Sequence, residues 1–105
     1  TLSPSLIYYD YLMDLYGANK DVDKGLETIR QARELFPHET SIGRDLIVTL
    51  GHLNKVDESF KVYNDEIKRG YHSDTLDIVM ADVFFGNDQV DSSFVITVAR
   101  KIQFR

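Results

Sequence analysis

The sequence has no cysteine, no long apolar run and no excess of basic residues, and each absence excludes a class of protein. Without cysteine the chain has neither a disulfide framework nor a Cys-ligated zinc site, while its redox compartment is left open. The apolar runs, such as residues 83–85, are far shorter than the roughly 20 residues that span a bilayer, so no transmembrane helix is expected. The net charge of −5 argues against a phosphate-rich partner, because nucleic-acid binding usually leaves a basic footprint.

Catalytic and metal-binding signatures are missing as well. There is no glycine-rich phosphate loop, and no Ser-His-Asp or Cys-His arrangement. His38, His52 and His72 fall in expected turns without a second ligand at metal-binding spacing, so we interpret them as polar turn residues. Acid pairs at 21/23 and 57/58 resemble general acid–base pairs, but their place at helix N-termini is explained by capping. We therefore expect no enzyme, no metal and no cofactor.

What is present has the composition of a globular domain. The chain of 105 residues is 43% hydrophobic and 28% charged, which predicts a single domain over residues 1–105. It begins without Met and without a charged-then-apolar leader, which indicates a segment of a longer or processed protein. The compartment is not fixed by the sequence, and an intracellular location, cytoplasm or mitochondrion, is the expectation.

One short pattern recurs at equal spacing and organises the chain. Val-Asp, any residue, a small residue and a large apolar residue occur at 22–26, 56–60 and 90–94, which are 34 residues apart. A fixed period of about 20–50 residues is the signature of stacked-repeat proteins, in which each repeat is one supersecondary unit. The same register aligns apolar positions upstream of each copy: Tyr8, Ile42 and Leu76; Leu12, Leu46 and Met80; Tyr16, Leu50 and Phe84.

Apolar stripes with helical spacing predict two helices in each repeat. Caps and breakers place them at about 4–17, 21–36, 40–51, 56–69, 74–86 and 88–102. Residues 94–98 also have strand propensity, so a strand is a rival interpretation there, although the repeat register favours helix. Gly25, Ser59 and Ser93 share one register position and are expected to let paired helices approach closely. The fold class is therefore all-α, with three stacked antiparallel helix hairpins, and the repeats cover about 5–39, 40–73 and 74–105.

This pattern resembles the tetratricopeptide repeat and its relative the pentatricopeptide repeat. Tyr9, Leu12 and Tyr16 match the large aromatic, leucine and tyrosine of the tetratricopeptide first helix, and residues 31–37 are close to its Ala…Pro ending. The stretches 58–63 and 66–74 are more similar to a pentatricopeptide ending, although that family prefers 35 residues per unit. The resemblance implies an α-solenoid and leaves both families open.

The first helix of each unit lines the concave, ligand-binding surface of such a solenoid. The candidate groove residues lie on the side of these helices that the apolar stripe does not use: Asp10, Asp14, Arg44, Val48, Ile78 and Asp82. Three carboxylates and one arginine suit a basic and apolar peptide or helix. The alternative is that they are solvated charges on an exposed face. The pentatricopeptide resemblance implies base-reading residues at Asp10, Arg44 and Ile78, which fit that family's small polar or amide pattern poorly.

Two further features bear on partners. Tyr8, Tyr9 and Tyr11 could stack on bases, but Tyr8 and Tyr9 occupy positions expected to pack between hairpins, which leaves Tyr11 as the surface candidate. The last helix is apolar nearly all round, whereas a terminal repeat normally has a polar outer face. We expect Phe94, Val98 and Ile102 to form a docking face for a further repeat, domain or subunit.

Together these features predict a non-catalytic protein–protein interaction scaffold that binds a peptide or helix in its concave groove. The alternative is a pentatricopeptide-type RNA-binding segment of an organellar gene-expression protein, for which the second repeat's ending is the observation. A third possibility, indicated by the apolar last helix, is a structural subunit with no separate ligand.

Overall fold

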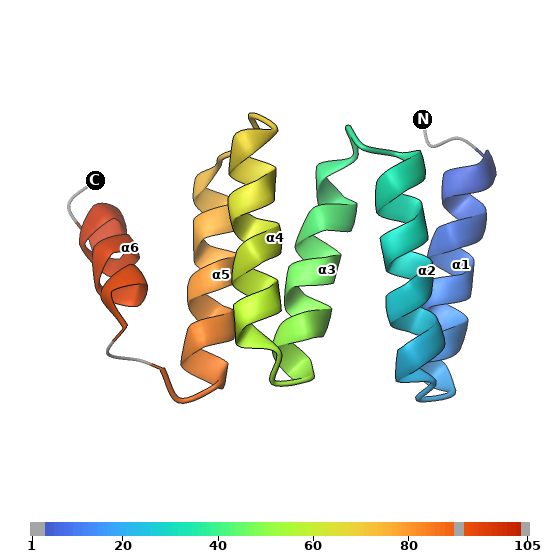
Figure 1. The fold of residues 1–105 in the computed structure, drawn as a ribbon, viewed down its shortest axis with the longest axis horizontal. Helices are drawn as coiled ribbons and strands as arrows, with labels where there is room; N and C mark the ends of the chain where they lie inside the picture. The colour runs from blue at the N-terminus through green and yellow to red at the C-terminus, as the bar shows by residue number, and fades with distance from the viewer. Residues whose placement is uncertain (1–3, 90–91, 104–105) are drawn as a thin grey trace. The chain divides into compact units, whose positions relative to one another are not determined.

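The computed structural model describes residues 4–89 and 92–103, and over these residues the protein is all-α, with six helices and no strand. The helices are α1 (Pro4–Ala18), α2 (Val22–Leu35), α3 (Thr40–His52), α4 (Val56–Lys68), α5 (Asp74–Gly86) and α6 (Ser93–Gln103) (Figure 1). Residues 94–98 are helical, so the rival strand interpretation is wrong. None of the helices in the described part of the chain combines the length and the apolar character needed to cross a membrane.

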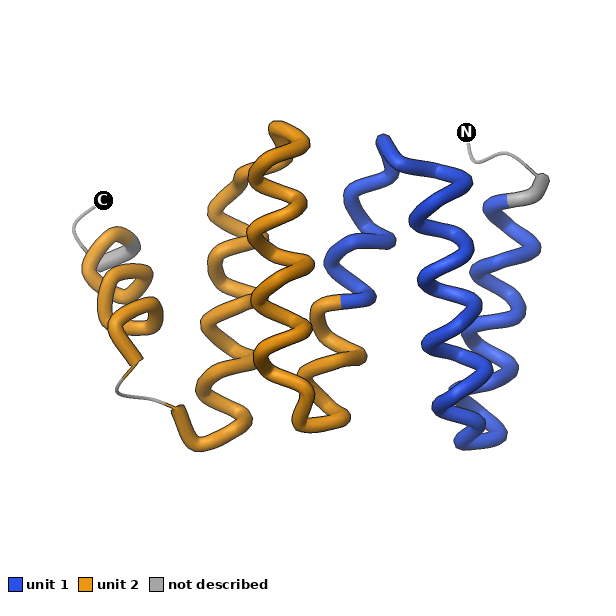
Figure 2. Tube along the Cα trace, in the orientation of Figure 1, with its two compact units in different colours: residues 1–46 blue, residues 47–105 orange. Residues whose placement is uncertain are grey.

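The helices belong to two compact units, residues 1–46 and residues 47–105, which are described separately below (Figure 2). The division falls within α3, so this helix contributes its first half to one unit and its second half to the other.

Most helix ends fall where side-chain chemistry predicts them. Asp21 accepts a hydrogen bond from the Lys24 backbone N–H at 3.4 Å and caps α2, and Ser73 accepts one from Leu76 at 3.1 Å and caps α5. The last helix is the exception, because α6 begins at Ser93 and not at Asp88. Asp88 has φ 61°, a left-handed conformation from which a right-handed helix cannot start. The Val90 assigned to this helix lies outside the described residues.

Unit 1 contains α1, α2 and the first half of α3. Leu6, Ile29, Ala32, Ile42 and Leu46 are its buried apolar residues. The ring of Tyr9 is half-buried and meets Phe36 edge-on, with 6.1 Å between ring centroids. Tyr8 does not pack as expected, because it remains 59% exposed. The outer side of α1 therefore keeps apolar side chains in solvent.

Unit 2 has a larger core built from α4, α5, α6 and the second half of α3. Its main buried cluster contains Ile47, Val56, Tyr63, Leu76, Met80, Val83 and Phe84. An aromatic group joins three helices, because Phe94 of α6 packs on Phe60 and Tyr63 of α4 and on Phe84 of α5, with centroids 5.1–5.5 Å apart. Such aromatic pairs contribute about 0.5–1.5 kcal/mol each beyond their buried area.

Small residues allow close helix approach at two places in unit 2. Ser59 of α4 is fully buried and donates a hydrogen bond from Oγ to the Ile47 carbonyl of α3 at 2.8 Å, as its register position predicts. Gly51, expected to end α3, lies inside it and faces α5, where an added Cβ would come within 2.8 Å of both Val83 methyl carbons. Ser93 is exposed at the start of α6, so the close approach expected there is absent.

We expect Gly51→Ala to lower the free energy of unfolding by about 1–3 kcal/mol, because Val83 is β-branched and cannot turn its methyl groups away. The matched control is Gly17→Ala, which has open space around the new methyl group and should be neutral or stabilising by up to about 1 kcal/mol. Urea denaturation followed by circular dichroism measures both. A Gly51→Ala protein as stable as the Gly17→Ala protein would show that the close approach does not exist.

Candidate functional site

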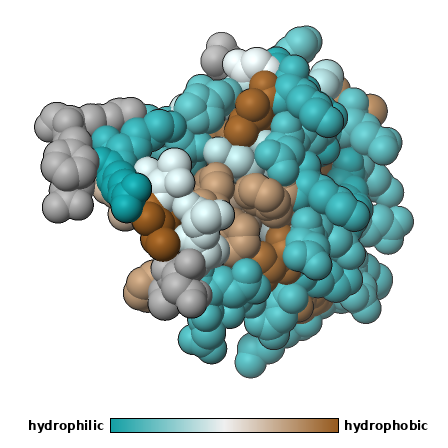
Figure 3. All heavy atoms as spheres, turned by 60° about the vertical axis from the view of Figure 1, so that its left-hand side comes forward, coloured by the Kyte–Doolittle hydropathy of each residue, from teal (hydrophilic) through white to brown (hydrophobic). Residues whose placement is uncertain are grey.

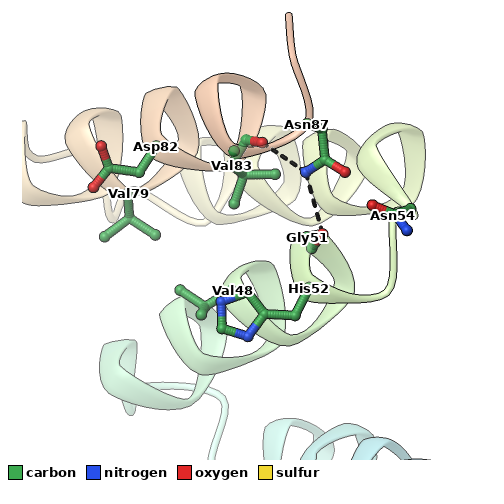
Figure 4. Close-up of a pocket in the computed structure, with 9 residues that line it drawn as sticks. Val48, Gly51, His52, Asn54, Val79, Asp82, Val83 and Asn87 are labelled. Carbon is green, nitrogen blue, oxygen red and sulfur yellow. Dashed lines mark hydrogen bonds between the residues drawn. The ribbon is translucent and has the colours of Figure 1, made fainter.

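A pocket of about 460 Å3 opens between the second half of α3 and the second half of α5, within unit 2 (Figure 4). Its lining is Val48, Gly51, His52, Asn54, Val79, Asp82, Val83, Gly86 and Asn87. Three valines supply an apolar surface, while one carboxylate, one imidazole and two amides supply polar groups around it. A concave apolar surface with a few polar groups is the usual composition of a ligand-binding site.

The two walls of the pocket are fixed to one another at one end. Gly51 allows α3 to approach Val83 of α5, and the Asn87 side chain then joins the two helices. Its Nδ2 donates to the Val83 carbonyl at 2.7 Å and to the Gly51 carbonyl at 3.2 Å, as the dashed lines in Figure 4 show. Asn87 thus connects the last turns of α3 and α5 at one end of the pocket.

Two of the six candidate groove residues line this pocket. Val48 of α3 and Asp82 of α5 are both exposed there, and they are 34 residues apart in the sequence. Ile78 is 41% exposed on α5 but does not belong to the lining. Of the three candidate groove residues in unit 2, the structure therefore brings Val48 and Asp82 together in the pocket and leaves Ile78 outside it.

The other three candidates lie in unit 1. Asp10 and Asp14 are exposed on α1, and Arg44 is half-buried on α3. The carboxylate of Asp45, which the sequence analysis did not select, interacts with the negative charge of Asp10 and with the positive charge of Arg44. Local desolvation of its carboxyl group, although the residue as a whole is exposed, and the nearby Asp10 carboxylate raise the pKa of Asp45, while the Arg44 guanidinium opposes them.

A second polar cluster surrounds the buried carboxylate of Asp77, whose side chain is 3% exposed. Tyr63 of α4 donates its hydroxyl to Oδ1, His72 Nε2 lies 2.9 Å from Oδ2, and Lys101 Nζ of α6 lies 3.0 Å from Oδ2. Burial alone would raise the pKa of Asp77, but these hydrogen bonds outweigh it and hold the pKa below its usual value. Burial and the Asp77 carboxylate raise the pKa of the Tyr63 hydroxyl.

The Asp77 cluster is a structural connection between helices. Its carboxylate receives donors from α4, from the segment before α5 and from α6, and it does not line the pocket. The sequence analysis missed it, although a signal was present. Asp77 lies one helical turn before Met80 and two before Phe84, so it occupies the core-facing stripe of α5, where a carboxylate requires partners.

The face expected for docking on α6 is directed inward. Val98 is 5% exposed and Phe94 packs in the aromatic group, so both belong to the core of unit 2. The side chain of Ile102 lies outside the described residues. The exposed large apolar residue on the described part of α6 is Ile96, at 44%.

Comparisons with protein-family models, with curated proteins and with solved structures found no match to this chain. Within the described residues there is also no group of three or more His, Asp or Glu side chains that could hold a metal ion. The pocket therefore has to be interpreted from its own chemistry.

We expect Asp77→Asn to lower the free energy of unfolding at neutral pH by about 1–3 kcal/mol, because the buried carboxylate loses its charge-assisted hydrogen bonds, whereas Lys101, at 44% exposure, remains solvated. A lowered pKa means that the carboxylate contributes its full stability above the unfolded value of 3.8, and that this contribution disappears as pH falls through the folded pKa. Urea titrations of wild type and Asp77→Asn over this pH range should therefore converge on acidification.

The control is Asp82→Asn, which removes an exposed carboxylate. Its stability difference from wild type should be small. Curves for wild type and Asp77→Asn that remain parallel down to acid pH would contradict the assignment of the pKa shift to this cluster.

Proposed function

We propose that the chain is a non-catalytic interaction module, a tetratricopeptide-like solenoid of three hairpins with a 34-residue period, and that it binds a peptide or helix. One observation carries the proposal: the pocket lies between α3 and α5, which the repeat register makes the first helices of the second and third hairpins. Val48 and Asp82 occupy the same repeat position on these two helices, and both line the pocket.

The chemistry of the lining selects the kind of ligand. Val48, Val79 and Val83 can take an aliphatic side chain, since they remove apolar surface from water without directional requirements. The exposed carboxylate of Asp82 can accept hydrogen bonds from a lysine or arginine. The net charge of −5 favours approach of a basic segment. The ligand that fits is a peptide in which a basic residue stands near an aliphatic one.

The same lining favours binding over catalysis. It contains one imidazole, His52, and one carboxylate, Asp82, but no hydroxyl, thiol or ammonium group that they could activate as a nucleophile. Asp77, the carboxylate whose pKa is lowered, lies outside the pocket and is surrounded by donors from its own unit. An RNA ligand is less well supported, because the acidic group of the pocket is Asp82 and would repel phosphates.

Selection from a displayed library of random peptides tests this function. Enriched peptides should share a lysine or arginine next to a branched aliphatic residue. Asp82→Ala should weaken their binding about tenfold or more, as expected for the loss of a charge-assisted hydrogen bond worth about 1.5–3 kcal/mol. Fluorescence anisotropy gives the affinities, and amide chemical shifts should change at Val48, Val79 and Asp82.

The matched control is Glu34→Ala, which removes one exposed carboxylate on α2 that does not belong to the pocket lining. Its peptide affinity should equal that of wild type. The same anisotropy assay with a mixed pool of single-stranded RNA tests the alternative. Saturable RNA binding that weakens steeply with salt, together with no enriched peptide, would overturn the proposal in favour of an RNA-binding segment.

A further inference from the structure

A second pocket, of about 520 Å3, adjoins the first one within unit 2. Its lining comes from the turn between α3 and α4, the first turn of α4 and the segment that follows α5. Lys55, Asp57 and Gln89 are exposed in this lining, so the second pocket is polar. Asn54 and Asn87 line both pockets, which therefore meet at these two side chains. We call the first the valine pocket and the second the polar pocket.

An occupant of both pockets has to satisfy two kinds of surface. Figure 3, which turns the α6 end forward, shows that apolar side chains of the protein gather in a hollow bordered by hydrophilic ones. The two pockets present the same contrast, because three valines line one and charged and amide side chains line the other. A molecule that crosses from one pocket to the other also has to pass the amide groups between them.

The amide of Asn87 is held in one orientation at this junction. Its Nδ2 donates to the carbonyl groups of Val83 at 2.7 Å and Gly51 at 3.2 Å, which uses both of its N–H groups. Oδ1 is directed away from these carbonyl groups in Figure 4, and it accepts no hydrogen bond from the described residues. Covering this oxygen without a donor would leave it unpaired, which is costly. The occupant must therefore supply an N–H group here.

Asn54 places a second amide beside the first. Its backbone N–H donates to the same Gly51 carbonyl at 3.1 Å, so the two asparagines converge on one acceptor. Asn54 has φ 61°, a left-handed conformation that asparagine tolerates better than most residues. Its side chain is exposed and forms no hydrogen bond with the described residues, so its donors and its acceptor can both serve an occupant.

These amide groups distinguish an extended ligand from a helical one. In a helix the main-chain N–H and C=O groups bond to one another, so they cannot reach Asn54 or Asn87. In an extended peptide these groups are free, and alternate side chains point to the same side. Two such side chains can enter the two pockets while the main chain between them passes the asparagines.

We propose that the occupant is an extended peptide that crosses from the valine pocket to the polar pocket. An aliphatic side chain fills the valine pocket, and the next side chain on the same side, a polar one, enters the polar pocket. The main chain between them donates an N–H to Oδ1 of Asn87 and pairs with the amide of Asn54. This inference rests on the proposed function, and it selects the peptide over the helix as the ligand.

A main-chain N-methylation scan of the strongest binder from the displayed peptide library provides the test. Each synthetic peptide replaces one N–H by N–CH3, and fluorescence anisotropy measures its affinity. Methylation at one position beside the aliphatic residue should weaken binding about tenfold or more, because Oδ1 of Asn87 is then covered without a donor. In Asn87→Ala this penalty should nearly disappear, since the acceptor is gone. Carbon chemical shifts of the labelled, bound peptide should be those of an extended chain.

A second variant is needed because Asn87 also connects α3 to α5. Asn54→Gly leaves that connection intact, and glycine accepts the left-handed conformation. It should weaken binding of the unmethylated peptide about two- to tenfold, the net contribution of a neutral hydrogen bond. Lys20→Gly is the matched control, because Lys20 lies one repeat period earlier with φ 57° and lines neither pocket. It should bind like wild type, and circular dichroism should show the same helix content in every variant.

The outcomes separate this inference from the proposed function. A peptide that requires Asp82 but tolerates N-methylation at every position, or that binds with helical chemical shifts, would overturn the extended binding mode alone. An equal methylation penalty in wild type and Asn87→Ala would do the same, since it indicates a steric clash and not a lost hydrogen bond. If no peptide is enriched, the proposed function fails and the extended binding mode fails with it.

Discussion

The close approach of α3 to α5 at Gly51 is the contact on which unit 2 depends. Because residue 51 has no side chain, Val83 can lie where a Cβ would otherwise be, and Asn87 can then reach the carbonyl groups of both helices. The pocket lies beside this contact, since Val48 and His52 come from the same turns of α3 as Gly51. A residue with a side chain at this position would separate the helices and change the volume of the pocket at the same time.

The buried Asp77 carboxylate performs a similar role for the last helix. Hydrophobic packing of Phe94 and Val98 brings α6 to the other helices, but apolar contact is non-directional and would tolerate several orientations. The hydrogen bond from Lys101 to Asp77 selects one of them, because a buried carboxylate left without this donor is costly. Packing therefore supplies attraction for α6, and the polar cluster supplies its orientation.

The helices could be predicted from the sequence because their causes are local. Asp21 and Ser73 cap where their side chains can reach the backbone, and the apolar stripes repeat every three or four residues. The errors have non-local causes. Ser93 repeats the register of Ser59 but is exposed in the first turn of α6. Phe94 was assigned outward because no local signal shows that it packs on three aromatic rings from α4 and α5. Of the pocket, Val48 and Asp82 could be selected by register, whereas Asn87 could not, since its role depends on a carbonyl 36 residues away.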